Sequence, residues 1–303
     1  MPLATIKEDV NLFYIYDKRR ECENPIIFTN GSIFNHRQWL SSYLPAFQRL
    51  TNDSYSYVLY DYQGIGQSSP RDEQFTLQSL AEELLVLLDY LGVEKAHLFG
   101  VSKGTMVNQV FAGLYPERVV SVGGYGIANL LAPNIEHERG VFLKRLEDLQ
   151  TLTDILSENI NSENFKRVIR TVYTPAIFLK QYSELNLKEK FIHWILERKF
   201  FSLVNGTPLK TMELLFSYYV YEIEKEIDFY AKCIESIGET PFLLLSGTED
   251  KTTPIGRAID LKTRLKNVKF VKFEGFEHIS PNIKKKQGIA LMQEYSDFLH
   301  HLV

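Results

Sequence analysis

Three residues far apart in the sequence have the side chains that nucleophilic catalysis needs: a serine, an acid and a histidine. Ser102 is the centre of the pentapeptide Gly-Val-Ser-Lys-Gly at positions 100–104. A serine hydroxyl is a poor nucleophile at neutral pH, so it needs an imidazole base and an acid that fixes the tautomer of that base. Asp250 and His278 follow in the order serine, acid, histidine. Such a trio attacks an acyl carbon.

The position of the pentapeptide makes it informative. It follows an apolar run at 96–99, and it precedes a helical stripe that contains Met106, Val107, Val110, Phe111 and Leu114. A nucleophilic serine sits on a sharp turn from strand to helix, and small residues on both sides allow that turn. The pentapeptide alone occurs by chance, and a serine there can simply cap a helix. Its place between a strand and a helix favours the nucleophile.

The acid and the histidine each follow a predicted strand. Asp250 comes after the apolar run at 242–245, and His278 comes after the alternating run at 268–273. Because sites form at the carboxyl ends of parallel strands, the three side chains are expected to converge at one edge of the sheet. Glu249 is the alternative acid, but its longer side chain one position earlier would point differently from the loop. The other histidines are better explained as surface, capping or packing residues.

Acyl transfer also needs N–H donors for the negatively charged oxygen of the intermediate. The backbone N–H of Lys103, directly after the serine, is the first expected donor. The backbone N–H of Ser32 is the second, because Asn30-Gly31-Ser32 follows the apolar run at 26–28. Asn30 is also a candidate for contact with the substrate. Without the trio, the Asn-Gly pair would be an ordinary turn.

The elements that must position these residues alternate along the chain. Short apolar runs and helical stretches follow one another, which is typical of a mostly parallel sheet flanked by helices, an α/β fold. A helix is expected between Thr76 and Gly92. The run at 12–16 predicts an antiparallel hairpin at one sheet edge, and the lysines within 268–273 predict the other edge. The expected parallel strands lie at 26–28, 57–60, 96–99, 119–122, 242–245 and 268–273.

Strand signals are absent between Leu131 and about Ser236. We therefore expect a core domain formed by 1–130 and 237–303, with a helical cap insertion at 131–236. The cap should supply an apolar wall that selects the acyl group. The candidates for that wall are Trp194, Phe200, Tyr218 and Tyr219. Helices are expected at 142–156, 191–203 and 212–230.

Length and composition limit the function classes. The 303 residues suit one core with one sizeable insertion. Hydrophobic residues at 45%, charged residues at 24% and a net charge of −4 describe an ordinary globular protein, and they give no case for nucleic acid. Cys22 and Cys233 match neither a disulfide framework nor a metal site. The N-terminus lacks the pattern of a signal peptide, and no stretch approaches the about 20 apolar residues of a membrane span. We expect a cytoplasmic protein without stable membrane insertion.

These motifs together resemble the α/β-hydrolase family over nearly the whole chain outside the cap. Residues 61–68 are similar to the family's Asp-x-Arg-Gly-x-Gly-x-Ser loop, residues 247–250 are similar to its acid loop, and Trp39 falls where many members keep an aromatic residue. The resemblance implies that Ser102, Asp250 and His278 form a catalytic triad. Three positions depart from the family pattern: Asn30 replaces a histidine, Gln63 replaces an arginine and Thr105 replaces a glycine.

The trio and the resemblance predict a serine hydrolase that cleaves a carboxylic ester or thioester through an acyl-enzyme. We expect a medium or long acyl group, an acyl-carrier protein or coenzyme A as candidate carriers, and neither a metal nor a cofactor. An acyltransferase is the alternative, because four short segments are similar to the hydroxyalkanoyloxyalkanoate synthases, which join two hydroxyacyl groups. These segments are 30–31, 66–68, 250–253 and 274–275. A further alternative is a non-catalytic ligand-binding protein on the same fold. The sequence indicates no oligomeric state.

Overall fold

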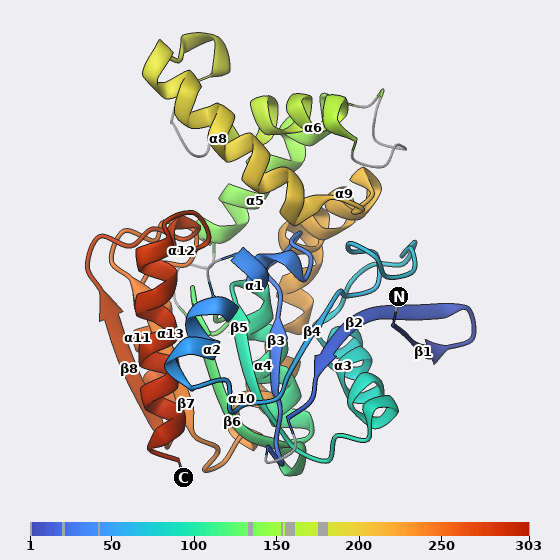
Figure 1. Cartoon of the computed structure of the whole chain (residues 1–303). Helices are drawn as coiled ribbons and strands as arrows, with labels where there is room; N and C mark the ends of the chain where they lie inside the picture. Colours follow the sequence, from blue (N-terminus) through green and yellow to red (C-terminus); the bar gives the residue numbers. More distant parts are fainter. Residues whose placement is uncertain are drawn as a thin grey trace.

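A twisted, mostly parallel sheet forms the centre of the protein (Figure 1). The computed structural model describes residues 2–19, 22–41, 43–132, 136–152, 154, 161–174 and 181–302. The sheet has eight strands in the order β1-β2-β4-β3-β5-β6-β7-β8. The strands are β1 Leu3–Lys7, β2 Val10–Asp17, β3 Ile26–Thr29, β4 Tyr57–Tyr60, β5 Ala96–Val101, β6 Val119–Tyr125, β7 Phe242–Gly247 and β8 Val268–Phe273.

The pairing of the strands agrees with the sequence prediction. From β4 to β8 every neighbouring pair is parallel, whereas β1 and β2 form an antiparallel hairpin that joins the sheet through β4. The inner strands β3, β4, β5 and β7 are buried along their whole length, which explains their unbroken apolar runs. Edge strand β8 exposes Lys269 and Lys272. The predicted α/β fold, with a hairpin at one edge and a lysine-bearing strand at the other, is confirmed.

Helices cover both faces of the sheet. One face packs against α3 (Leu77–Leu91), α4 (Lys103–Leu114), α10 (Ile227–Ser236) and α11 (Gly256–Arg264), and the other packs against α2 (Leu44–Leu50) and α13 (Lys285–His300). Helix α3 begins and ends where the sequence predicts. The hydroxyl of Thr76 accepts the N–H of Ser79, and Gly92 adopts a left-handed conformation at the end.

The described chain between β6 and β7 forms helices and turns but no strand. Helices α5 (Glu136–Gln150), α6 (Ser162–Val168), α8 (Leu187–Val204) and α9 (Leu209–Ser217) lie beyond the carboxyl edge of the sheet (Figure 1). Helix α10 instead packs against α4, where the Tyr230 hydroxyl donates a hydrogen bond to Gln109. The predicted division of the chain into a core and a cap at 131–236 stays a prediction. Of the helix expected over 142–156, α5 contains 142–150, residues 151–152 form a turn, and 153 and 155–156 lie outside the described residues.

The single helix predicted over 212–230 is wrong. Helix α9 ends at Ser217, a π turn and a 3₁₀ turn follow, and α10 begins at Ile227. Glu226 explains the break, because its carboxylate accepts the Tyr218 hydroxyl and also the N–H of Leu77 at the start of α3. These bonds hold the irregular turn on the core. Within the described residues, no helix is both long and apolar enough to cross a membrane.

Candidate active site

Ser102 lies on a strained turn between β5 and α4. Its φ is +54° and its ψ is −118°, a conformation that a non-glycine residue rarely adopts. The turn is so tight that it leaves no room for a Cβ on either glycine. A Cβ on Gly100 would lie 2.6 Å from the carbonyl carbon of Gly104, and one on Gly104 would collide with the Thr29 carbonyl. Glycine on both sides therefore lets the backbone hold the serine in this conformation.

The structure brings the serine, the histidine and the acid together. Ser102 Oγ lies 3.0 Å from His278 Nε2, and His278 Nδ1 lies 2.8 Å from Asp250 Oδ2. An ionised carboxylate only accepts hydrogen bonds, so Nδ1 carries the proton that it donates to Asp250. Nε2 is then free to accept the proton of the Ser102 hydroxyl. The three side chains come from the ends of β5, β7 and β8, as the sequence predicts.

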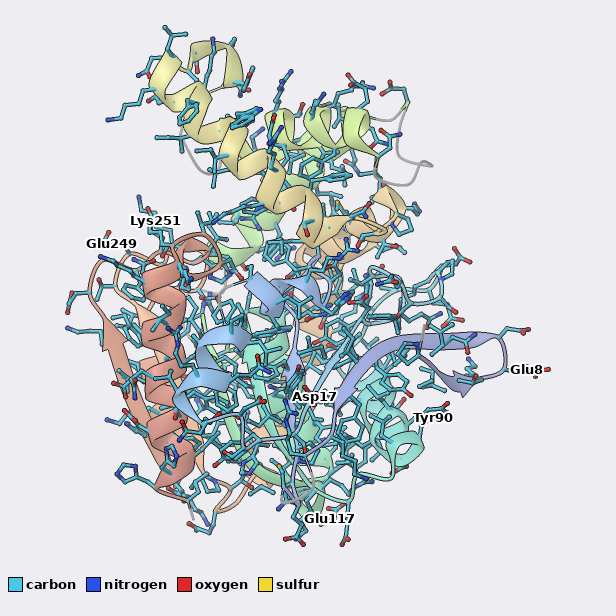
Figure 2. The ribbon with its side chains drawn as sticks, viewed as in Figure 1. Glu8, Asp17, Tyr90, Glu117, Glu249 and Lys251 are labelled. Carbon is cyan, nitrogen blue, oxygen red and sulfur yellow. The ribbon has the colours of Figure 1, made fainter. Side chains whose placement is uncertain are left out.

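Asp250 is buried and held by several donors. Its Oδ1 accepts the N–H groups of Thr252 and Thr253, and its Oδ2 accepts the Thr253 hydroxyl at 2.8 Å. These donors stabilise the ionised carboxylate and fix its direction. Glu249, the alternative acid, is exposed at the sheet edge below the helices of the insertion (Figure 2). Thr253 was not predicted; the signal for it was an aspartate followed by threonines, which favours a side-chain-to-backbone turn.

Thr105, which replaces a glycine of the family pattern, braces the turn. Its hydroxyl donates to the Ser102 carbonyl at 2.7 Å and accepts the N–H of Ala128 at 3.1 Å. Gly124 on β6 makes room for it, since a Cβ there would lie 2.7 Å from the Thr105 methyl group. The substitution thus ties the nucleophile turn to the chain that follows β6.

Asn30, the second departure, is wholly buried below the loop. Its amide donates to the Tyr60 carbonyl at 2.7 Å, and its oxygen accepts the Trp39 indole N–H at 2.6 Å. The predicted contact between Asn30 and a substrate is not supported, because both polar groups of the side chain are engaged and the residue does not line the cavity. Asn30 instead fixes the start of the loop. Gln63, the third departure, donates to the Pro70 carbonyl.

The loop after β3 also depends on a residue that sequence reasoning missed. Gln38 accepts the Gly31 N–H at 2.9 Å, and its amide donates to Asn282 at 3.1 Å in α12 (Ser280–Ile283). Ser32 and Ser102 line the same cavity. Lys103 begins α4, so its N–H has no acceptor within the helix. Ser32 therefore lines the cavity that Ser102 faces, and Lys103 follows Ser102 directly in the chain; their role as oxyanion donors stays a prediction.

A cavity of about 560 Å³ opens in front of Ser102 and His278. Loops at the carboxyl ends of the strands, called the sheet edge below, form one wall, and helices of the β6–β7 insertion form the other. The apolar residues that the insertion contributes are Phe142, Ile192, Leu196, Phe200 and Phe216.

The predicted wall residues divide into two groups. Phe200 lines the cavity, and the Tyr219 hydroxyl lies 3.3 Å from Ser32 Oγ at its border. Trp194 does not line the cavity; it is 47% exposed and stacks on Phe191. Tyr218 does not line it either, because its hydroxyl turns toward Glu226. Helical periodicity marks which residues are apolar, but it does not show that Tyr219 contacts Ser32 while the adjacent Tyr218 contacts Glu226.

The side chain of Lys103 is a second feature that the sequence did not reveal. Its ammonium group is buried 3.9 Å from the centre of the Tyr62 ring, and it has no hydrogen-bond partner within the described residues. Burial lowers the pKa of Lys103 to about 7. The nearby Arg71–Glu83 ion pair is also buried.

The comparison with known proteins agrees with this fold. Residues 24–281 match the sequence model of the alpha/beta hydrolase fold family. The chain belongs to the alpha/beta hydrolase family. A solved alpha/beta hydrolase enzyme from a Medee basin deep-sea metagenome library superposes with a TM-score of 0.71 at 21% identity, over 99% of this chain and 97% of that one.

Two curated relatives of this alpha/beta hydrolase are similar in sequence. A proline iminopeptidase of Lactobacillus helveticus is 25% identical over 247 residues, which are 79% of each chain. A 3-oxoadipate enol-lactonase of Acinetobacter baylyi is 38% identical over 90 residues, 30% of this chain and 31% of the lactonase. The match thus spans less than a third of the lactonase.

Proposed function

We propose that this alpha/beta hydrolase is a serine hydrolase that cleaves a carboxylic ester or thioester through an acyl-enzyme. The observation that carries the proposal is the hydrogen bond from the Ser102 hydroxyl to His278 Nε2, on a turn strained enough to present that hydroxyl to the cavity. A serine that merely capped a helix would need no imidazole partner. The two relatives are named as an enol-lactonase and an iminopeptidase, and both names denote enzymes that hydrolyse an acyl bond, which supports the same class of reaction.

In the proposed first half-reaction, His278 Nε2 removes the proton of the Ser102 hydroxyl while Oγ bonds to the acyl carbon. The carbonyl oxygen becomes negative, and the N–H groups of Ser32 and Lys103 stabilise it. Asp250 stabilises the imidazolium that forms. The tetrahedral intermediate then collapses, the bond to the leaving alcohol or thiol breaks, and His278 returns the proton to the leaving group. The acyl-enzyme remains.

In the second half-reaction, water takes the place of the leaving group. His278 removes a proton from the water while its oxygen attacks the acyl carbon, and the same N–H groups stabilise the second intermediate. Its collapse releases the carboxylic acid and returns the proton to Ser102 Oγ. If an alcohol occupied the place of the water, the product would be a new ester, which is the acyltransferase alternative.

The shape of the cavity favours a medium or long acyl group. Aromatic and aliphatic side chains of the insertion line the wall opposite Ser102, among them Phe142, Leu196 and Phe200. An acetyl group would leave most of this apolar surface in contact with water, whereas a longer chain would cover it. The proposal includes a carrier for a thioester substrate: the acyl group would be attached to an acyl-carrier protein or to coenzyme A.

Labelling with a fluorophosphonate tests the nucleophile. We expect one label per chain, at Ser102, and none in Ser102→Ala. Labelling that persists in this variant would overturn the assignment. Mass spectrometry of the products from a hydroxyacyl thioester separates the two outcomes of the second half-reaction: free hydroxy acid supports hydrolysis, and a dimeric ester supports acyl transfer.

A further inference from the structure

Arg145 is a cation in the wall of the cavity, and no anion lies beside it among the described residues. It lies on α5, lines the same cavity as Ser102 and His278, and is half-buried. Its Nε is buried without a hydrogen-bond partner, and no ion pair to the guanidinium is found within the described residues. The guanidinium group lies over two aromatic rings: its carbon is 5.3 Å from the centre of the Phe142 ring and 5.8 Å from the centre of the Tyr173 ring.

The other charged residues that line the cavity differ from Arg145. Glu249, Lys251, Glu277 and Lys284 are all exposed at the mouth, where water can solvate them (Figure 2 labels the first two). Lys284 Nζ also lies 3.7 Å from Glu277 Oε2, close enough to form an ion pair. Among the lysines and arginines that are described and line the cavity, Arg145 is therefore the one that is half-buried and not exposed.

Other arginines of the insertion show what a structural arginine looks like in this protein. Arg139, also on α5, binds Glu224 at 2.7 Å, and Arg167 binds both carboxylate oxygens of Asp154. Each is on the surface, where such a pair contributes little to stability. Arg145 has the more costly position and, among the described residues, lacks such a carboxylate partner. Desolvating a charge without a counter-ion is unfavourable, and contacts with aromatic faces offset only part of that cost.

The guanidinium group suits one kind of ligand. It is planar and always charged near neutral pH, and its fork of N–H donors matches the two oxygens of a carboxylate. We propose that Arg145 binds a carboxylate of the substrate, so that the ester or thioester cleaved at Ser102 carries a second, ionised acid group. This inference rests on the proposed function, because it names the substrate class of the same site.

Matched pairs of esters test the inference. The p-nitrophenyl monoesters of adipic, pimelic and suberic acids carry the carboxylate on the acyl side, and straight-chain acyl esters of equal length are the neutral references. A second pair, the hexanoyl esters of 4-hydroxybenzoate and of its methyl ester, places the carboxylate on the leaving group. In one of the two arms we expect the wild-type protein to have a kcat/KM about 10- to 100-fold higher for the anionic ester.

The variants separate recognition from structure. Arg145→Met keeps the length of the side chain and should abolish the preference by lowering kcat/KM for the anionic ester only. Arg145→Lys should restore part of it. Lys144→Met removes a neighbouring positive charge from the same helix, but its ammonium is exposed, so the preference should remain. A wild-type protein without a preference in either arm would overturn the inference. An Arg145→Met variant in which kcat/KM falls equally for the anionic and the neutral ester would also overturn the inference.

A binding measurement keeps this test apart from the test of the proposed function. In Ser102→Ala, which cannot form an acyl-enzyme, adipate should raise the melting temperature and 1,6-hexanediol should not. The double variant Ser102→Ala/Arg145→Met should lose the response to adipate. If this shift appears while no ester is cleaved by the wild-type protein, the anion site stands and the proposed reaction fails. If esters are cleaved but adipate gives no shift that depends on Arg145, the inference fails alone.

Discussion

The two walls of the cavity are built in opposite ways. At the sheet edge, the polar side chains that face the reaction are held by hydrogen bonds: His278 by Asp250, Asp250 by Thr253, and the loop at Gly31 by Gln38. In the insertion, the cavity wall is mostly apolar, and its half-buried cation, Arg145, has no anionic partner among the described residues. One wall is pre-organised, and the other offers shape and charge.

This difference separates two kinds of effect. Interactions that are fixed before the substrate arrives stabilise the transition state of every substrate, so changes at the sheet edge should lower kcat for all esters. Surfaces that gain their partner only from the substrate discriminate between substrates, so changes in the insertion should alter the ratio of kcat/KM values. The predictions below test this separation.

Asp250→Asn should have the largest effect, a loss of about 10⁴-fold in kcat for short, long, neutral and anionic esters alike. The amide would no longer hold the tautomer of His278 that leaves Nε2 free. Steady-state kinetics on all four ester types, with circular dichroism to show an intact fold, provide the measurement. Glu249→Gln is the matched control, and it should retain activity within about twofold because Glu249 is exposed. A larger loss in the control than in Asp250→Asn would reverse the assignment of the acid.

Thr253→Val should have a smaller effect of the same kind. Valine keeps the shape of threonine but removes the hydroxyl that binds Asp250 Oδ2, while the backbone donors to Oδ1 remain. We expect a fall of about tenfold in kcat/KM, equal for all acyl chains, since one charge-assisted hydrogen bond is lost. Thr252→Val is the control, because only its backbone binds Asp250. A change in the ratio between acyl chains would show that the two walls are not separate.

The same contrast describes what could be predicted from the sequence. The strands and the hairpin were predictable because apolar runs and glycine turns are local signals, and the trio was predictable because the order serine, acid, histidine and the strand before each residue can be read from the sequence. The residues that face the cavity from the insertion were not. Trp194 and Phe200 lie on the same helix, and only tertiary packing decides that Phe200 faces the cavity. The lack of a partner for Arg145 depends on contacts distant in the sequence.

Phe200→Leu should change selectivity more than rate. Phe200 lines the cavity, and leucine would leave part of the acyl chain without packing partners. We expect the wild-type protein to prefer octanoyl over acetyl p-nitrophenyl esters, and the variant to reduce that ratio about 3- to 10-fold with little change for acetyl. Phe191→Leu, at an exposed position of the same helix, should leave the ratio unchanged. An equal loss for both esters would place Phe200 among the residues that support the reaction itself.

Lys103→Met should leave catalysis nearly unchanged and alter stability instead. Lys103 is an exception at the carboxyl ends of the strands, since its buried ammonium contacts the Tyr62 ring but has no hydrogen-bond partner among the described residues. Its backbone N–H, the proposed oxyanion donor, is kept in the variant. Methionine has a similar length and carries no charge, so it should avoid a desolvation cost of up to about 5 kcal/mol at low pH.

The pH dependence gives this last prediction its sign. The pKa of Lys103 is lowered from 10.5 to about 7 in the folded protein, so between these values the unfolded chain binds the proton and the folded chain does not. The wild-type protein therefore gains stability as pH rises through this window, and it bears the full cost below about pH 7. Urea unfolding at several pH values should show Lys103→Met more stable than the wild type near pH 6, with a difference that shrinks toward pH 10. A difference that stayed constant would mean that a counter-charge such as Glu83 compensates the desolvation of the Lys103 ammonium in the folded protein.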